Sequence, residues 1–118
     1  MLHEINGDLT TAEATLTHWE KNYSGVAKAA TNAEVEYEIA LQTAIDELGK
    51  AEIPQGQKAP TVDAIKARAF VKCEQLYRTY KATKSDLEVA KKLIGIAETK
   101  LTSIQTRVKI EQMEMSLS

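Results

Sequence analysis

The chain has 118 residues, which is enough for one domain at most. Hydrophobic residues make up 43% of it but aromatic residues only 5%, and two Pro and five Gly leave few places to turn, so long helices are favoured over a many-stranded fold. The net charge of -2 gives no whole-chain argument for nucleic-acid binding, and the single Cys excludes an internal disulfide.

A first helix is predicted over residues 8–49. Positions alternately three and four residues apart are all apolar or aromatic, which is typical of a coiled-coil seam. This first ladder consists of Leu9, Ala12, Leu16, Trp19, Tyr23, Val26, Ala30, Ala33, Tyr37, Ala40 and Ala44. Thr10 and Glu13 have the spacing of a capping box at its start, and Gly49 is a stop signal at its end.

The segment 50–61 is predicted to be the connection between two helices. It contains both prolines of the chain, Pro54 and Pro60, which prevent helix continuation, and Gly56, which permits a bend. We expect a corner rather than a linker between domains, because neither half of the sequence has a core of its own. Its length exceeds that of most connections in helical bundles, which leaves a contact role open.

A second helix is predicted over residues 62–115, with Thr61 as its N-cap. The second ladder consists of Cys73, Leu76, Tyr80, Thr83, Leu87, Ala90, Ile94, Ala97, Leu101, Ile104 and Val108, after which Glu111 interrupts it. A further apolar row runs beside it, made of Val89, Leu93, Ile96 and Ile110. The resulting stripe is too wide for one partner helix and indicates three or four helices around it.

These patterns predict an all-α protein in which the two helices form one antiparallel, coiled-coil-like hairpin domain over residues 1–118. Residues 1–50 carry nine acidic and three basic residues, whereas residues 51–118 carry eight and twelve, so the halves are complementary in charge. With Leu48 opposite the start of the second helix, Tyr37 is expected near Glu74, within a turn or so. Residues after about 103 are expected to lack a partner within the chain.

The surplus apolar surface predicts self-association, most simply as a dimer that forms a four-helix bundle. The expected interface residues are Leu87, Leu93, Ile94, Leu101, Ile104 and Val108.

The sequence offers no constellation for catalysis. His3 and His18 are the only histidines, and neither has the short-range companions of a zinc site or a hydrolytic triad. Cys73 lies on the second ladder, which favours a buried structural thiol. We therefore expect a protein that is not an enzyme, binds no cofactor and no metal, and acts by contact with itself or with another protein.

A basic stretch in the second helix supports an alternative function. Cations beside an aromatic ring can bind single-stranded nucleic acid through phosphate contacts and stacking. The candidate contacts are Arg78, Lys81, Lys84, Lys91 and Lys92, with Tyr77 beside them. A solvated lysine face is the simpler interpretation, because one tyrosine is not a stacking platform.

Residues 68–111 resemble the long C-terminal helix of small helical proteins encoded by bacteriophages and prophages, in the stretches LYRTYKATKSDLEVAKKL and LTSIQTRVKIE. The resemblance implies a short early phage protein that assists recombination or replication, or that binds and inhibits a host factor. No apolar run reaches the roughly 20 residues of a membrane span, and the N-terminus lacks a signal-peptide pattern, so a cytoplasmic location without membrane contact is expected.

Overall fold

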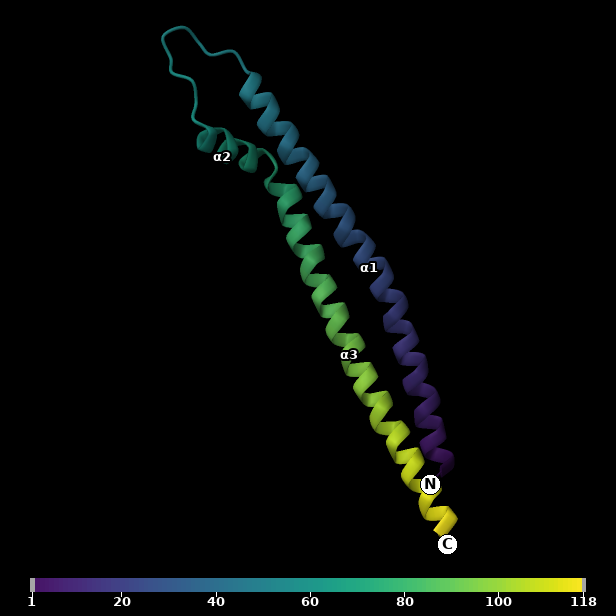
Figure 1. Ribbon diagram of the computed structural model, residues 1–118. Coiled ribbons are helices and arrows are strands. Elements are labelled where there is room, and N and C mark those ends of the chain that lie inside the picture. The colour runs from purple at the N-terminus through teal and green to yellow at the C-terminus, as the bar shows by residue number, and fades with distance from the viewer. Residues whose placement is uncertain (1, 118) are drawn as a thin grey trace. The chain divides into compact units, whose positions relative to one another are not determined.

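A computed structural model describes residues 2–117 of the protein (Figure 1). Helix α1 spans Leu2–Lys50, α2 spans Val62–Lys72 and α3 spans Glu74–Leu117. No β-strand occurs within this range, so the prediction of an all-α protein is confirmed.

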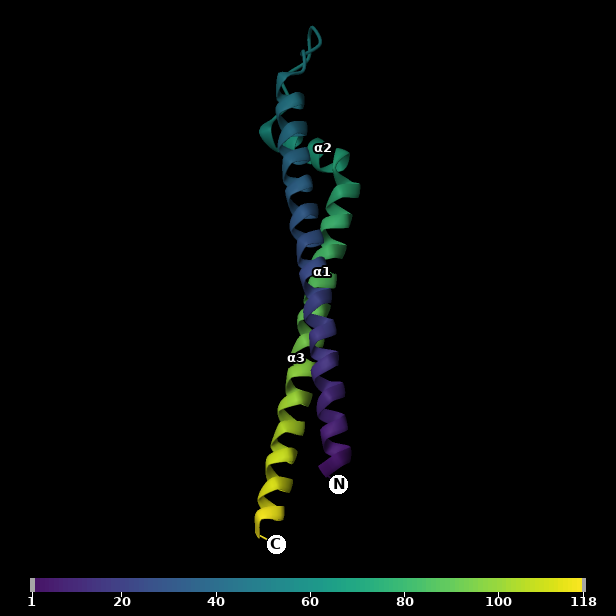
Figure 2. The ribbon, with the colours of Figure 1, turned by 90° about the vertical axis from the view of Figure 1, so that its right-hand side faces the viewer.

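Contacts between residues divide the chain into two compact units, and both long helices contribute to each. Unit 1 comprises Met1–Ala27 and Asp86–Ser118, and unit 2 comprises Lys28–Ser85. Within each unit α1 and α3 run antiparallel and side by side, as two views at right angles show (Figures 1 and 2). The hairpin pairing is therefore present in both units, whereas the single domain remains a prediction.

The two predicted ladders form the seams between the helices. Every member of both ladders is buried or half-buried, and alanines are prominent among the buried members. Because alanine has only a methyl side chain, it lets two helices approach closely but buries little apolar area. The seam therefore sets the pairing of α1 with α3 while leaving other helix faces uncovered.

In unit 1 the core is made of Ile5 and Ala12 from α1 and Ile104 from α3. Leu9, Leu101 and Val108 pack against it, half-buried. The expectation that residues after about 103 lack a partner within the chain is therefore wrong for these positions. The expectation failed because α1 starts earlier than predicted. Burial of Ile5 stabilises helical turns before residue 8, which the sequence pattern did not include.

The predicted capping box is also wrong. Helix α1 already includes Thr10, whose hydroxyl donates a hydrogen bond to the carbonyl oxygen of Asn6 at 3.1 Å. A hydroxyl that donates to the preceding turn is used as a helix-interior group and does not accept from an exposed N–H as a cap would.

Unit 2 contains a break in the predicted second helix. At Cys73 the backbone leaves helical geometry (φ -101°, ψ 11°), and the Cys73 N–H donates to the carbonyls of Ala69 and Phe70, both at 3.1 Å. The break turns α2 away from the direction of α3 (Figure 1). It brings Ala69 and Cys73 against Ala44 of α1, and Ala69 is completely buried there.

This packing explains the break physically. Three apolar residues of α1 lie beside the first ladder, and all three pack against the core of unit 2: Leu41, Ile45 and Leu48. A straight continuation of α3 presents only its own seam to α1, whereas the redirected α2 adds a second surface over this widened stripe. Lys72 and Glu74 on either side of the break carry no turn signal, so only tertiary packing marks it.

The connection and the start of α2 follow the predicted chemistry. The Gln57 N–H donates to the Pro54 carbonyl at 3.1 Å, and Gly56 between them has a φ of 83°, which glycine adopts without steric cost. Thr61 accepts from the Ala64 N–H at 3.1 Å, which confirms it as the N-cap of α2.

Candidate interaction surfaces

An apolar row lies open on α3 in unit 1, on the flank of the helix beside its seam. Val89 is 55% exposed and Ile96 is 65% exposed, while Leu93 between them is half-buried. Their spacing of four and three residues places them along one stripe of the helix. We call Val89, Leu93 and Ile96 the open row.

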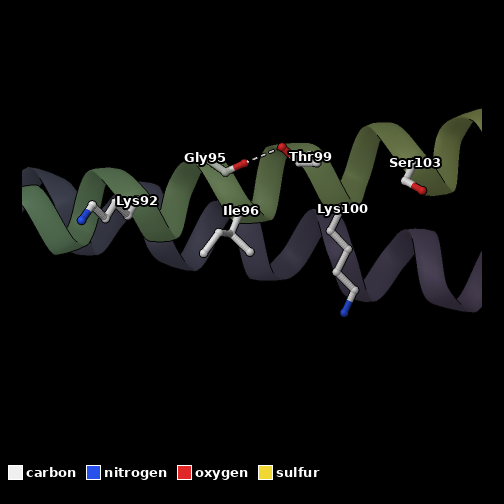
Figure 3. A pocket seen from close by; sticks show the side chains of 6 residues that line it. All are labelled: Lys92, Gly95, Ile96, Thr99, Lys100 and Ser103. Carbon is white, nitrogen blue, oxygen red and sulfur yellow. Dashed lines mark hydrogen bonds between the residues drawn. The ribbon is translucent and has the colours of Figure 1, made fainter.

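A shallow groove surrounds the end of the open row (Figure 3). It is lined by Lys92, Gly95, Ile96, Thr99, Lys100 and Ser103. A Cβ added at Gly95 would meet no atom within 4 Å, so the helix backbone is accessible at this point. Close backbone access of this kind is what a second helix needs in order to pack tightly.

The polar groups of the groove are partly satisfied within α3. The Thr99 hydroxyl donates to the Gly95 carbonyl at 2.9 Å, as the dashed line in Figure 3 shows. Because this hydroxyl is already bonded, Thr99 can offer its methyl group to a partner without a large desolvation cost. The floor of the groove is therefore more apolar than its composition indicates.

The charged residues that line the groove are both basic. Lys92 and Lys100 lie one turn before and one turn after Ile96 along α3 (Figure 3). A surface with an apolar centre and cations on both sides favours an apolar partner with acidic flanks over an acid-free one.

A second open apolar patch lies on α1 in unit 2. Val35 is 46% exposed and Ile39 is 63% exposed, and their spacing of four residues places them on one face of the helix. Glu36 and Glu38 lie on either side of this face and are exposed. We call Val35, Ile39 and these two glutamates the acidic patch.

The predicted interface residues are placed mainly in the seam within the chain. Ile104 is buried in the core of unit 1, with Leu101 and Val108 packed against that core. Leu87 and Ile94 are half-buried on the same ladder. Leu93 is the member of the predicted set that belongs to the open row.

Four aromatic rings gather in unit 2, a feature that the sequence pattern did not predict. Tyr37 of α1 lies against Tyr77 and Tyr80 of α3, with ring centroids 5.3 and 5.8 Å apart. Phe70 of α2 meets Tyr77 edge-on at 5.1 Å. The Lys81 ammonium lies 5.4 Å from the ring centroids of both Tyr77 and Tyr80, within cation–π distance.

The cluster refines the expected helix register. Tyr37 was expected near Glu74 to within a turn or so, and it contacts Tyr77 and Tyr80, three and six residues further along α3. The signal in the sequence that pointed to this cluster was residue spacing. Tyr80 and Lys81 follow Tyr77 by three and four residues, so both lie beside it on the helix surface. One aromatic residue across the seam is then enough to complete the cluster.

The cluster also changes the electrostatics of Tyr37. Burial raises the pKa of the Tyr37 hydroxyl above its ordinary value, and the neighbouring Tyr77 and Cys73 act in the same direction. The Lys81 ammonium opposes them and lowers that pKa.

The five basic candidates differ in their surroundings. The Arg78 guanidinium donates to the Glu74 carboxylate at 2.9 Å, so Arg78 forms an exposed ion pair within α3. Lys81 is engaged by the aromatic cluster, and Lys92 lines the groove of unit 1. The other two, Lys84 and Lys91, are exposed on α3.

Over residues 2–117, no group of three or more His, Cys, Asp or Glu side chains is placed to hold a metal ion. In the same range no helix combines the length and apolar character that crossing a membrane requires. Comparisons with models of protein families, with curated proteins and with solved structures find no match, so function has to be argued from these surfaces.

Proposed function

We propose that the protein is a non-enzymatic helical interaction module that works by docking another helix onto α3. The observation that carries this proposal is the open row in unit 1, where Val89 and Ile96 are more than half exposed beside a covered seam. Water contact of large apolar side chains costs about 25 cal/mol per Å², so a partner that covers them gains binding energy without any rearrangement of the seam.

A photoreactive amino acid placed at position 96 tests this function in the protein's native cells. The expected result is a specific covalent adduct, because the side chain at this position points into the partner. Thr102 is the matched control position: it is exposed on the same helix but does not line the groove. Equal adduct formation at both positions, or none at 96, would contradict the proposal.

The identity of the adduct separates the partner classes. An adduct of twice the chain mass indicates self-association, as the surplus apolar surface predicts. An adduct with a different protein indicates a foreign partner, such as the host factor that the phage resemblance implies.

A second candidate function is single-strand nucleic-acid binding, and the aromatic cluster favours it. The cluster places two rings, Tyr77 and Tyr80, beside Lys81 where the sequence indicated only Tyr77. Titration of labelled single-stranded DNA at low and moderate salt tests it. Binding should weaken steeply with salt, and the variant with Lys81, Lys84 and Lys91 changed to Glu should lose it. Absence of binding at low salt rules this function out.

A further inference from the structure

The groove around the open row is basic, whereas the acidic patch is negatively charged, and both have apolar centres. Lys92 and Lys100 flank Ile96 of the open row, and Glu36 and Glu38 flank Val35 and Ile39 in the acidic patch. Both surfaces lie on helices, and both present large apolar side chains that are about half exposed or more. Each therefore lacks the kind of surface that the other offers.

We infer that the groove of α3 in one molecule receives the acidic patch of α1 from a second copy of this chain. This inference rests on the proposed function and adds to it the identity of the partner. Val35 and Ile39, one helical turn apart, pack against the open row, and the glutamates on their flanks approach the ammonium groups of Lys92 and Lys100.

Two identical surfaces should pair less well than the open row with the acidic patch. Two copies joined through their open rows would bring four lysine ammonium groups to one interface, and two acidic patches would do the same with glutamates. Like charges across an interface cost several kcal/mol, so charge favours the mixed contact over either symmetric one. Glycine at position 95 leaves room for the backbone of the incoming helix.

Charge reversal tests the pairing without touching either seam. The first variant carries Lys92→Glu and Lys100→Glu, and the second carries Glu36→Lys and Glu38→Lys. All four side chains are exposed, so both variants are expected to fold, and circular dichroism verifies this. Molar mass as a function of concentration, measured by sedimentation velocity at low salt, is the readout.

The wild-type protein should self-associate, and each variant alone should associate at least about tenfold more weakly, since both of its surfaces then have the same sign. An equimolar mixture of the two variants should regain association, because each surface again meets its opposite. A control with Lys58→Glu and Lys109→Glu has the same change in net charge as the first variant, lies outside both surfaces and should associate like the wild type.

Three results would overturn the inference: a wild-type protein that stays monomeric at all concentrations, variants that associate unimpaired, or a mixture that does not recover. The position-96 adduct separates this failure from that of the proposed function. An adduct with a foreign protein leaves the interaction module intact while removing the second copy as its partner.

Discussion

Tyr37 of α1 and Tyr80 of α3 stack with 20° between their ring planes and 5.8 Å between their centroids. This contact fixes the register of the two helices in unit 2. An alanine-rich seam tolerates neighbouring registers at similar cost, because each offers the same small methyl groups. A pair of large rings does not, since a shift by one turn would separate them.

The stacking should appear as a coupling energy. Tyr37→Ala and Tyr80→Ala should each destabilise the protein, and the double variant should lose about 0.5 to 1.5 kcal/mol less than the sum of the two. Urea denaturation of the four proteins in the cycle measures it. Strict additivity would mean that the rings do not stabilise each other.

Stability should fall at alkaline pH partly through Tyr37. The pKa of the Tyr37 hydroxyl is raised in the folded protein above the ordinary value of 10.0. The stability that Tyr37 contributes is therefore fully present below pH 10.0 and is lost as the pH rises through the raised pKa. Urea denaturation from neutral to strongly alkaline pH should show a steeper loss for the wild type than for Tyr37→Phe, which cannot ionise there. Parallel curves for the two proteins would contradict the raised pKa.

Removing a buried isoleucine of unit 1 should cost more stability than removing an exposed one on the same helix. Ile104→Ala removes a side chain that is 5% exposed and packed near Ile5 and Ala12, so it should cost about 2 to 4 kcal/mol. Ile110→Ala is the matched control on the same helix: Ile110 is 49% exposed, and its loss should cost about 0.5 kcal/mol or less. Similar losses for the two would place the core elsewhere.

The close contact under α2 should reject a larger side chain. Ala69 is completely buried against Ala44 and Cys73, so Ala69→Leu should destabilise the protein by about 1 to 3 kcal/mol. Ala67→Leu, on the exposed side of the same helix, should be close to neutral because leucine is also a good helix former. Thermal denaturation of both variants distinguishes overpacking from a general effect of leucine.

Two glycines should respond in opposite directions to alanine. Gly56→Ala places a side chain where φ is 83° and should cost about 1 to 2 kcal/mol. Gly7 lies inside α1 and has open space around it, so Gly7→Ala should stabilise the protein by about 0.5 to 1 kcal/mol. A destabilising Gly7→Ala would indicate that the first turns of α1 are not helical in solution.

The sequence predicted the seams well because a three-four ladder is a local property of the chain. The same reasoning found the open row, since Val89 and Ile96 made the stripe wider than one partner needs. It could not find the groove at Gly95, because backbone access depends on what surrounds the residue. It also missed the acidic patch, since Val35 and Ile39 lie off the ladder as an isolated pair.

The break at Cys73 and the early start of α1 were beyond prediction for a common reason. Each is decided by a contact distant in sequence: Ala69 against Ala44 for the break, and Ile5 against Ile104 for the start. Local turn and cap signals describe the isolated helix, and tertiary packing outweighs them at both positions.

Glu111 follows Val108 at the next step of the second ladder and is half-buried. Glu111 lines a small cavity together with the charged Glu4, Asp8 and Arg107 and the apolar Ile5 and Ile110, so the Glu111 carboxylate lies mainly among charged side chains at the end of the seam. A slide of α3 by one heptad toward the middle of α1 would carry this carboxylate in among Leu9 and Ala12, where a buried charge is costly. A charged residue at the end of the seam thus disfavours this shifted pairing and helps α1 and α3 keep a single alignment in unit 1.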